Sequence, residues 1–168
     1  EDIDRIGVNP RFMAMYAVDD EKAGWKKGQW HTAVPPQARP STGLTPVDYF
    51  GRKMVDNLPD SIKVGTITVA VGGASIDLFD KRTCKAYLKK QPDWMKNFAS
   101  QYNGNPYARL IELAKIAQKQ GVIKGILLHQ GETNNGDVNW PNRVKTVYND
   151  ILKELHLKAE DVPLLVGE

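Results

Sequence analysis

A polar loop directly after an apolar run holds the side chains of this 168-residue chain that are best suited to chemistry. The apolar run covers residues 123–128, and the loop brings together an imidazole, two amides, a carboxylate and a hydroxyl. Its residues are His129, Gln130, Gly131, Glu132, Thr133 and Asn134. The pattern predicts a buried strand that ends in a ligand-binding loop, because open α/β sheets bind ligands at the carboxyl ends of their strands. The alternative is a loop whose side chains only satisfy local backbone groups.

Two glycines follow a second strand-like run. Residues 62–71 are rich in β-branched side chains and lead directly into Gly72 and Gly73. Glycines at this position permit a tight turn, and exposed backbone N–H groups there can bind an anion. The spacing matches neither a dinucleotide fingerprint nor a P-loop. On spacing alone, a plain strand-to-loop turn and an oxyanion site both stay open.

The block from His129 to Asn134 resembles the His-Gln-Gly-Glu-Ser-Asn block of carbohydrate acetyl esterases, with Thr133 where Ser is usual. These are the SGNH-type hydrolases of carbohydrate esterase family six, which includes acetylxylan esterases, and their sialate O-acetylesterase relatives. Gly72 and Gly73 match the second block of that family. The resemblance implies an esterase that removes O-acetyl groups from xylan or related sugars with a serine nucleophile and no cofactor. It also favours a secreted or periplasmic location.

The resemblance assigns roles to individual residues. The Gly73 N–H and the side-chain amide of Gln130 would donate to the oxyanion of the reaction, and such donors are worth roughly 3 kcal/mol each in analogous sites. Glu132 would be the catalytic acid that orients a histidine, a role that the Asp of the family's Asp-x-x-His block could fill equally well. Gly72 and Asn134 would line the site.

His129 would also line the site, and two states of its imidazole are open. Because His129 directly follows an apolar run, a buried neutral ring with a backbone partner is favoured over a catalytic base. His129 and Glu132 alone do not make a zinc-ligand set, so no metal site is expected.

The serine and histidine blocks of the family are not found in this chain. Its serines, Ser41, Ser61, Ser75 and Ser100, lie outside the required contexts, and His156 has no Asp at the right offset. We therefore expect residues 1–168 to be the central part of one SGNH-type domain. It would be truncated at both termini and inactive alone, with the Ser and His blocks outside the chain. The alternative is a non-catalytic carbohydrate-binding domain on the same scaffold.

Residues 19–43 show no helical or strand period and carry Trp25 and Trp30. A long segment of this kind in a compact domain is often a functional loop. The flat apolar face and polar N–H edge of Trp suit a sugar ring, so both residues are candidate contacts for an acetylated carbohydrate. The alternative is that they pin the loop to the body of the domain.

The remaining pattern predicts an α/β fold in which apolar runs alternate with capped helices. Near-continuous apolar runs are typical of a parallel sheet that is covered on both faces. The expected strands cover 62–71, 123–129 and 163–167, and the expected helices cover 46–58, 106–120 and 140–155. The resemblance implies the three-layer α/β/α, flavodoxin-like architecture of SGNH hydrolases. The sheet would be mostly parallel and incomplete at both ends, with a gap where the missing first strand would lie.

Composition excludes several other classes of protein. A net charge of +3 without a basic stripe argues against a nucleic-acid partner. No apolar run reaches the roughly 20 residues of a membrane span, so no membrane partner is expected. The single cysteine, Cys84, forbids an internal disulfide. An acetylated carbohydrate is the expected partner, and the sequence does not indicate an oligomeric state.

Overall fold

The computed structural model describes residues 8–167. The chain divides into two compact units, Glu1–Ala70 and Val71–Glu168, and each is described by itself. Among the described residues, no helix has the length and apolar character that a membrane span requires.

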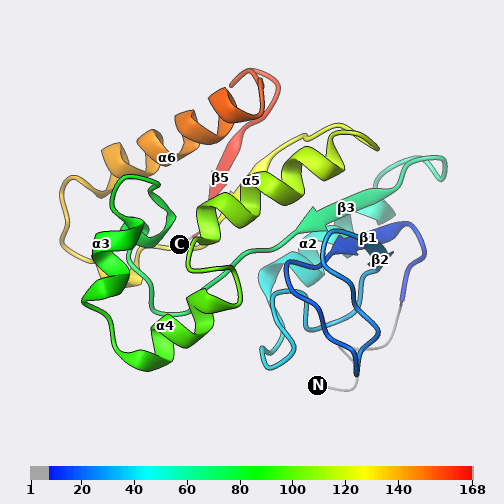
Figure 1. The fold of residues 1–168 in the computed structure, drawn as a ribbon. Coiled ribbons are helices and arrows are strands. Elements are labelled where there is room, and N and C mark those ends of the chain that lie inside the picture. The colour runs from blue at the N-terminus through cyan, green and yellow to red at the C-terminus, as the bar shows by residue number, and fades with distance from the viewer. Residues whose placement is uncertain (1–7, 168) are drawn as a thin grey trace. The chain divides into compact units, whose positions relative to one another are not determined.

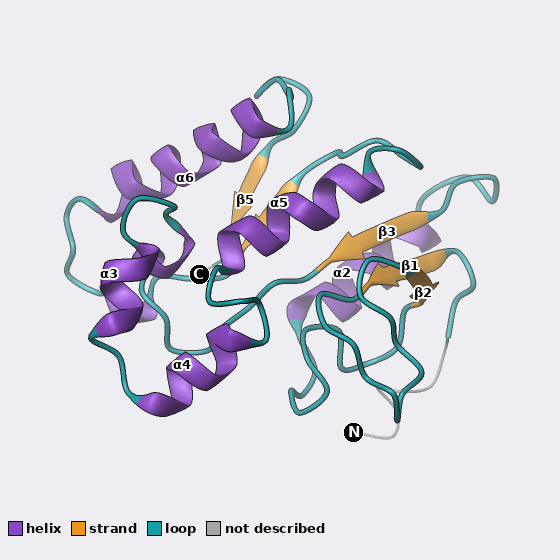
Figure 2. Cartoon of the chain, in the orientation of Figure 1, coloured by secondary structure: helices purple, strands orange, loops and turns teal. Residues whose placement is uncertain are grey.

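The first unit is built on a sheet of three short strands with the order β2-β1-β3 (Figures 1 and 2). The strands are β1 (Phe12–Met15), β2 (Trp30–Thr32) and β3 (Val64–Ile67). β1 lies in the centre, parallel to β3 and antiparallel to β2. The sequence predicted β3 but missed β2, because three residues between glycine-rich and proline-rich turns are too few to show a period.

Helix α2 (Pro46–Asp56) packs on this sheet and begins as its capping residues predict. The Asp48 carboxylate accepts hydrogen bonds from the Thr45 backbone N–H at 2.9 Å and from the Thr45 hydroxyl at 3.1 Å. Asp48 is buried and also accepts from Gln37 Nε2 at 2.7 Å. Gln37 Oε1 in turn accepts from the Thr66 hydroxyl at 3.0 Å. A buried polar chain therefore links the start of α2 to β3.

The core of the first unit is aromatic. The rings of Tyr16 and Trp25 stack with centroids 3.8 Å apart, and Phe12 and Val55 are buried in the same cluster. Gly51, on the buried face of α2, lies directly against the Phe12 ring. The absence of a side chain at Gly51 is what allows α2 to approach β1 so closely.

The second unit contains two parallel strands, β4 (Ile126–Leu128) and β5 (Leu164–Val166). A 3₁₀ helix, η1, contacts three of the α-helices, namely α3, α5 and α6. Figure 1 shows the helices of this unit in green to orange. The helical segments are η1 (Ile76–Phe79), α3 (Cys84–Lys89), α4 (Asp93–Ser100), α5 (Pro106–Ala117), η2 (Glu132–Asn134) and α6 (Trp140–Glu154). The sequence predicted α5 and α6 and expected only one short helix before them.

The expectation of one sheet is corrected by the structure, since hydrogen bonds join the described strands in two separate sheets. β4 and β5 are parallel to each other, as expected. The apolar run before His129 is also less buried than expected, because two isolated strands offer few neighbours to cover them. Leu127 is 44% exposed and Leu165 is 53% exposed. The fold is mixed α/β with small sheets.

The contact between Gly51 and Phe12 gives a stability prediction. Gly51→Ala would place a Cβ 2.0 Å from two atoms of the Phe12 ring, and Phe12 is buried, so the ring or the helix would have to shift. Overpacking of this kind costs about 1–3 kcal/mol, which exceeds the gain of up to about 1 kcal/mol from replacing a helical glycine. We expect a lower free energy of unfolding in urea denaturation. Gly43→Ala, where the new Cβ meets nothing within 4 Å, is the matched control. Equal stability of the two variants would contradict this packing.

Candidate active site

Two loops of the second unit are held together by hydrogen bonds, and they carry the residues singled out in the sequence. The Thr133 hydroxyl donates to the Gly73 carbonyl at 2.9 Å. Gln130 Nε2 donates to the carbonyl of Ala74, the next residue along, at 3.2 Å. The glycine pair and the polar block therefore lie beside each other.

Gln130 is 9% exposed, and its amide is fully engaged. Besides the Ala74 carbonyl, Nε2 donates to Asn134 Oδ1 at 2.8 Å. Oε1 accepts from the indole N–H of Trp140, at the start of α6, at 2.7 Å. A side-chain amide has two N–H donors, so both are in use. Gln130 thus joins both loops and α6.

Asn134 makes the second set of bonds between the loops. Its Oδ1 also accepts from the backbone N–H of Ile76 at 2.9 Å, and its Nδ2 donates to the Ser75 hydroxyl at 3.2 Å. Within residues 8–167 the second Nδ2 hydrogen of Asn134 has no partner. Asn134 is half-buried, so this donor is left for a ligand.

The backbone N–H of Gly73 is a further free donor. Gly73 is exposed, and its φ of +69° lies in the left-handed region that favours glycine. In the described part of the chain, this N–H donates to no other group. Gly72, the preceding residue, is also exposed. The turn therefore exposes a backbone N–H at Gly73 that is free to donate a hydrogen bond, as an oxyanion donor must be.

The structure corrects the expectation for His129. Its imidazole is 60% exposed rather than buried, because the two-stranded β4-β5 sheet leaves the end of β4 uncovered. His129 Nε2 lies 3.7 Å from Glu132 Oε1, which is too long for a hydrogen bond. The Glu132 carboxylate is exposed as well, so it is open to a further partner.

Ser75 is a poor nucleophile in this arrangement. It is buried, and its hydroxyl donates to Asp77 Oδ2 at 3.0 Å. Ser75 Oγ also accepts from Asn134 Nδ2 and from the Asp77 backbone N–H. Activation of a serine needs a histidine base within hydrogen-bond reach, and the Ser75 proton is directed to a carboxylate instead.

An ion-pair network holds Asp77, which follows the turn at Gly72 and Gly73, against α6. Arg143 on α6 pairs with Asp77 Oδ1 through Nη2, and with Asp137 Oδ2 at 2.7 Å through Nη1. Partial burial alone would raise the pKa of Asp77. The hydrogen bonds from Arg143 and Ser75 outweigh that effect and hold the pKa below its ordinary value. The sequence had given Arg143 and Asp77 no role, because nothing in their spacing shows that they meet.

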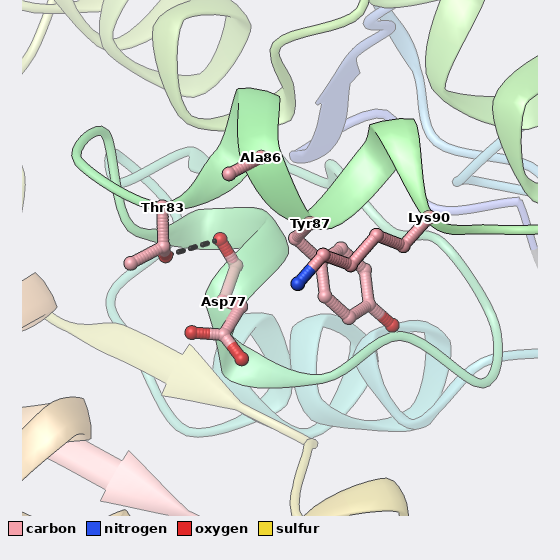
Figure 3. Close-up of a pocket in the computed structure, with 5 residues that line it drawn as sticks. All are labelled: Asp77, Thr83, Ala86, Tyr87 and Lys90. Carbon is pink, nitrogen blue, oxygen red and sulfur yellow. Dashed lines mark hydrogen bonds between the residues drawn. The ribbon is translucent and has the colours of Figure 1, made fainter.

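A pocket of about 210 Å³ borders the same loop (Figure 3). The Tyr87 hydroxyl in this pocket accepts from the Ser75 backbone N–H at 3.0 Å, and Thr83 donates to the Asp77 carbonyl at 2.9 Å. The pocket is lined by Asp77, Thr83, Ala86, Tyr87 and Lys90. It contains no nucleophile with an adjacent base and none of the residues predicted for the site.

The two tryptophans predicted to contact sugar lie in the first unit, and both make packing contacts. Trp25 is 6% exposed and stacks on Tyr16. The Trp30 ring covers Gly65 so closely that a Cβ there would lie 2.6 Å from it. These contacts match the alternative in which both rings pin their loop to the sheet. As for metals, no group of three or more His, Cys, Asp or Glu in the described residues is placed to hold an ion.

The buried amide of Gln130 predicts a loss of stability on truncation. Gln130→Ala would leave the Ala74 carbonyl and the Trp140 N–H without their partner, and each such group costs about 1–3 kcal/mol. With two such groups, we expect urea denaturation to show a loss of about 2 kcal/mol or more. Thr133→Ala is the matched control, because it removes one exposed bond to the same loop and should cost less than about 1 kcal/mol. Equal losses in the two variants would contradict the role of Gln130 as the main link.

The depressed pKa of Asp77 predicts a dependence on pH. A carboxyl group with a lower pKa in the folded state stabilises the fold above its unfolded pKa of about 3.9. That contribution is lost as the pH falls through the folded value. Arg143→Met removes the main partner of Asp77, so the stability of the variant should fall less steeply below about pH 4. The measurement is the free energy of unfolding between pH 3 and 7. Parallel curves would show that the pair adds nothing.

Comparison with known families accounts for nearly the whole chain. The family described as carbohydrate esterase, sialic acid-specific acetylesterase, matches residues 15–168. The match includes both hydrogen-bonded loops and the free N–H of Gly73. The chain therefore belongs to the sialic acid-specific acetylesterase family of carbohydrate esterases.

Proposed function

We propose that this protein removes O-acetyl groups from xylan or related acetylated sugars. One observation carries the proposal: the glycine turn and the His-Gln-Gly-Glu block are hydrogen-bonded to each other in a chain that belongs to a carbohydrate esterase family. The family description names sialic acid, so an O-acetylated sialic acid is the second candidate substrate. In this proposal the chain forms one domain of the three-layer SGNH type.

The reaction is an acyl transfer in two steps. A serine oxygen attacks the acetyl carbonyl while a histidine takes the serine proton, and the carbonyl oxygen becomes an oxyanion. The histidine then gives the proton to the sugar oxygen, which leaves as a hydroxyl. Water releases acetate from the acetyl-enzyme by the same route. The Ser75 hydroxyl is engaged with Asp77, so we place the serine and histidine in sequence outside these 168 residues.

The oxyanion hole is the part of the machinery that this chain would supply. The Gly73 N–H is the first donor, because Gly73 is exposed and, within the described residues, its N–H makes no hydrogen bond that a substrate would have to displace. Gln130 is the second, and to act its amide group must shift as a whole, so that the hydrogen now bonded to Asn134 Oδ1 reaches the substrate. Asn134 would keep its bond from the Ile76 N–H in that event. Asn134 itself is the competing donor, since one of its Nδ2 hydrogens is free among the described residues.

Glu132 is proposed as the acid that orients the histidine. Its carboxylate is exposed at the same loop, and its nearest cationic group, His129, stays beyond hydrogen-bond distance. A carboxylate in this state can accept the Nδ1 hydrogen of an incoming imidazole and stabilise the imidazolium that forms during the reaction. An Asp outside this chain is the competing candidate for the same role.

A comparison of chain lengths tests the function. The 168-residue chain should release acetate from acetylated xylo-oligosaccharides at the background rate, because it lacks an activated serine. A longer protein that adds the serine and histidine blocks should turn the same substrates over. In that longer protein, Gln130→Ala should lower kcat by about 10²-fold if Gln130 is an oxyanion donor. Acetate release under saturating substrate is the measurement.

Three further variants of the longer protein sharpen the test. Thr133→Ala disturbs the same loop without removing an oxyanion donor, so it controls for loop damage. Asn134→Ala should cost more than Gln130→Ala if Asn134 is the second donor. Glu132→Ala should cost a comparable factor only if Glu132 orients the histidine. Saturable turnover by the 168-residue chain would place a nucleophile inside it, and a longer protein without esterase activity would favour a carbohydrate-binding domain.

A further inference from the structure

A third tryptophan, Trp94, lies directly beside the candidate oxyanion donor. A Cβ built on Gly73 would lie 3.5 Å from Cη2 of the Trp94 indole. The Trp94 side chain is 49% exposed, although tryptophan is on average a highly buried residue. Both residues belong to the second unit, so this contact does not depend on how the two units are placed.

The ring is held in place although it is exposed. Trp94 lies in the first turn of α4, and Met95 and Ala99 are the buried residues of that helix. The Phe98 ring, one turn along, meets the Trp94 ring edge-on with centroids 6.0 Å apart. A ring fixed by its own helix loses little further freedom when a ligand stacks on it, which favours its use as a binding surface.

The other three tryptophans use their rings or indole N–H groups in contacts within the protein. Trp25 is stacked inside the first unit, Trp30 covers Gly65, and Trp140 donates its N–H to Gln130. Among residues 8–167, the indole N–H of Trp94 has no hydrogen-bond partner. Isolated exposed apolar residues are common and need no function. The position of Trp94 against Gly73 distinguishes it from such residues.

We propose that Trp94 is the stacking surface for the sugar ring that carries the acetyl group. A pyranose ring presents an apolar C–H face, which suits the indole face, and its hydroxyl groups can accept from the indole N–H. A sugar stacked on Trp94 would lie next to Gly73, because the ring is 3.5 Å from the Cβ position of that residue. This inference rests on the proposed esterase function and adds the residue that selects substrates with a ring.

The consequence is a preference for acetylated sugars over acetyl esters that lack a ring. The stacked ring does not change charge or shape during acyl transfer, so the contact should be equally strong in the ground state and in the transition state. Its loss should therefore raise KM for sugar esters and leave kcat nearly unchanged. A merely structural role would instead affect all substrates alike.

The experiment uses the longer protein that carries the serine and histidine blocks, with Trp94→Ala and Trp94→Phe. The substrates are an acetylated xylo-oligosaccharide, an O-acetylated N-acetylneuraminic acid, and triacetin as the ester without a ring. Trp94→Ala should raise KM for at least one of the sugar esters by about tenfold, the size expected for one lost aromatic contact. Its kcat/KM for triacetin should stay within about twofold, and Trp94→Phe should retain most of the sugar affinity.

Calorimetric titration with the xylo-oligosaccharide and with the sialic acid separates the two proposals. A parent protein that hydrolyses no ester but binds a sugar that Trp94→Ala does not bind would end the esterase proposal and support the stacking surface. Equal KM values and equal sugar affinities in parent and Trp94→Ala would overturn the stacking surface alone. A parent that neither binds nor hydrolyses any of these compounds would overturn both. Unchanged thermal midpoints of the variants would show that folding is intact.

Discussion

The buried amide of Gln130 is the interaction on which the rest of the site depends. Its three hydrogen bonds reach the Ala74 carbonyl, Asn134 in its own loop, and Trp140 at the start of α6. Only an amide side chain can donate twice and accept at the same time through one rigid group. A carboxylate in its place would have no donor for the Ala74 carbonyl, and an apolar residue would leave both the Ala74 carbonyl and the Trp140 N–H without this partner. This requirement explains a glutamine here even before any reaction is considered.

The other polar contacts around the two loops extend the same framework. Arg143 holds Asp77 and Asp137 together, Tyr87 accepts from the Ser75 N–H, and Asn134 accepts from the Ile76 N–H. Such a set of bonds fixes the backbone before a substrate arrives. A fixed donor needs no reorganisation at the moment when charge develops, and this is the main source of oxyanion stabilisation in acyl transfer. The framework therefore matters because it leaves the Gly73 N–H unbonded and in a fixed position.

How far the sequence could predict the structure depended on how local each feature is. The start of α2 was predictable because Thr45 and Asp48 lie within one turn and bond to each other. The start of α5 was predictable for the same reason, since Asn105 Oδ1 accepts from the Ala108 N–H. The sequence predicted a gap in the sheet at the missing first strand, but it could not show which strands would stay paired, because an apolar run indicates a strand but not its partner. For the same reason, the sequence did not predict that the His129 side chain, at the end of β4, would be exposed.

The roles of the polar residues were harder to predict, because a residue type shows what a side chain can donate but not what it has already donated. Gln130 and Gly73 were equal candidates in the sequence. In the structure both Gln130 hydrogens are bonded, whereas the Gly73 N–H has no partner within the described residues. The tryptophans divide in the same way, with Trp25 stacked in a core and Trp94 exposed beside the glycine turn. The hydrogen-bond donors and ring faces that a residue does not use inside the protein are thus a better guide to ligand binding than the motif in which it lies. This criterion favours Gly73 and Trp94.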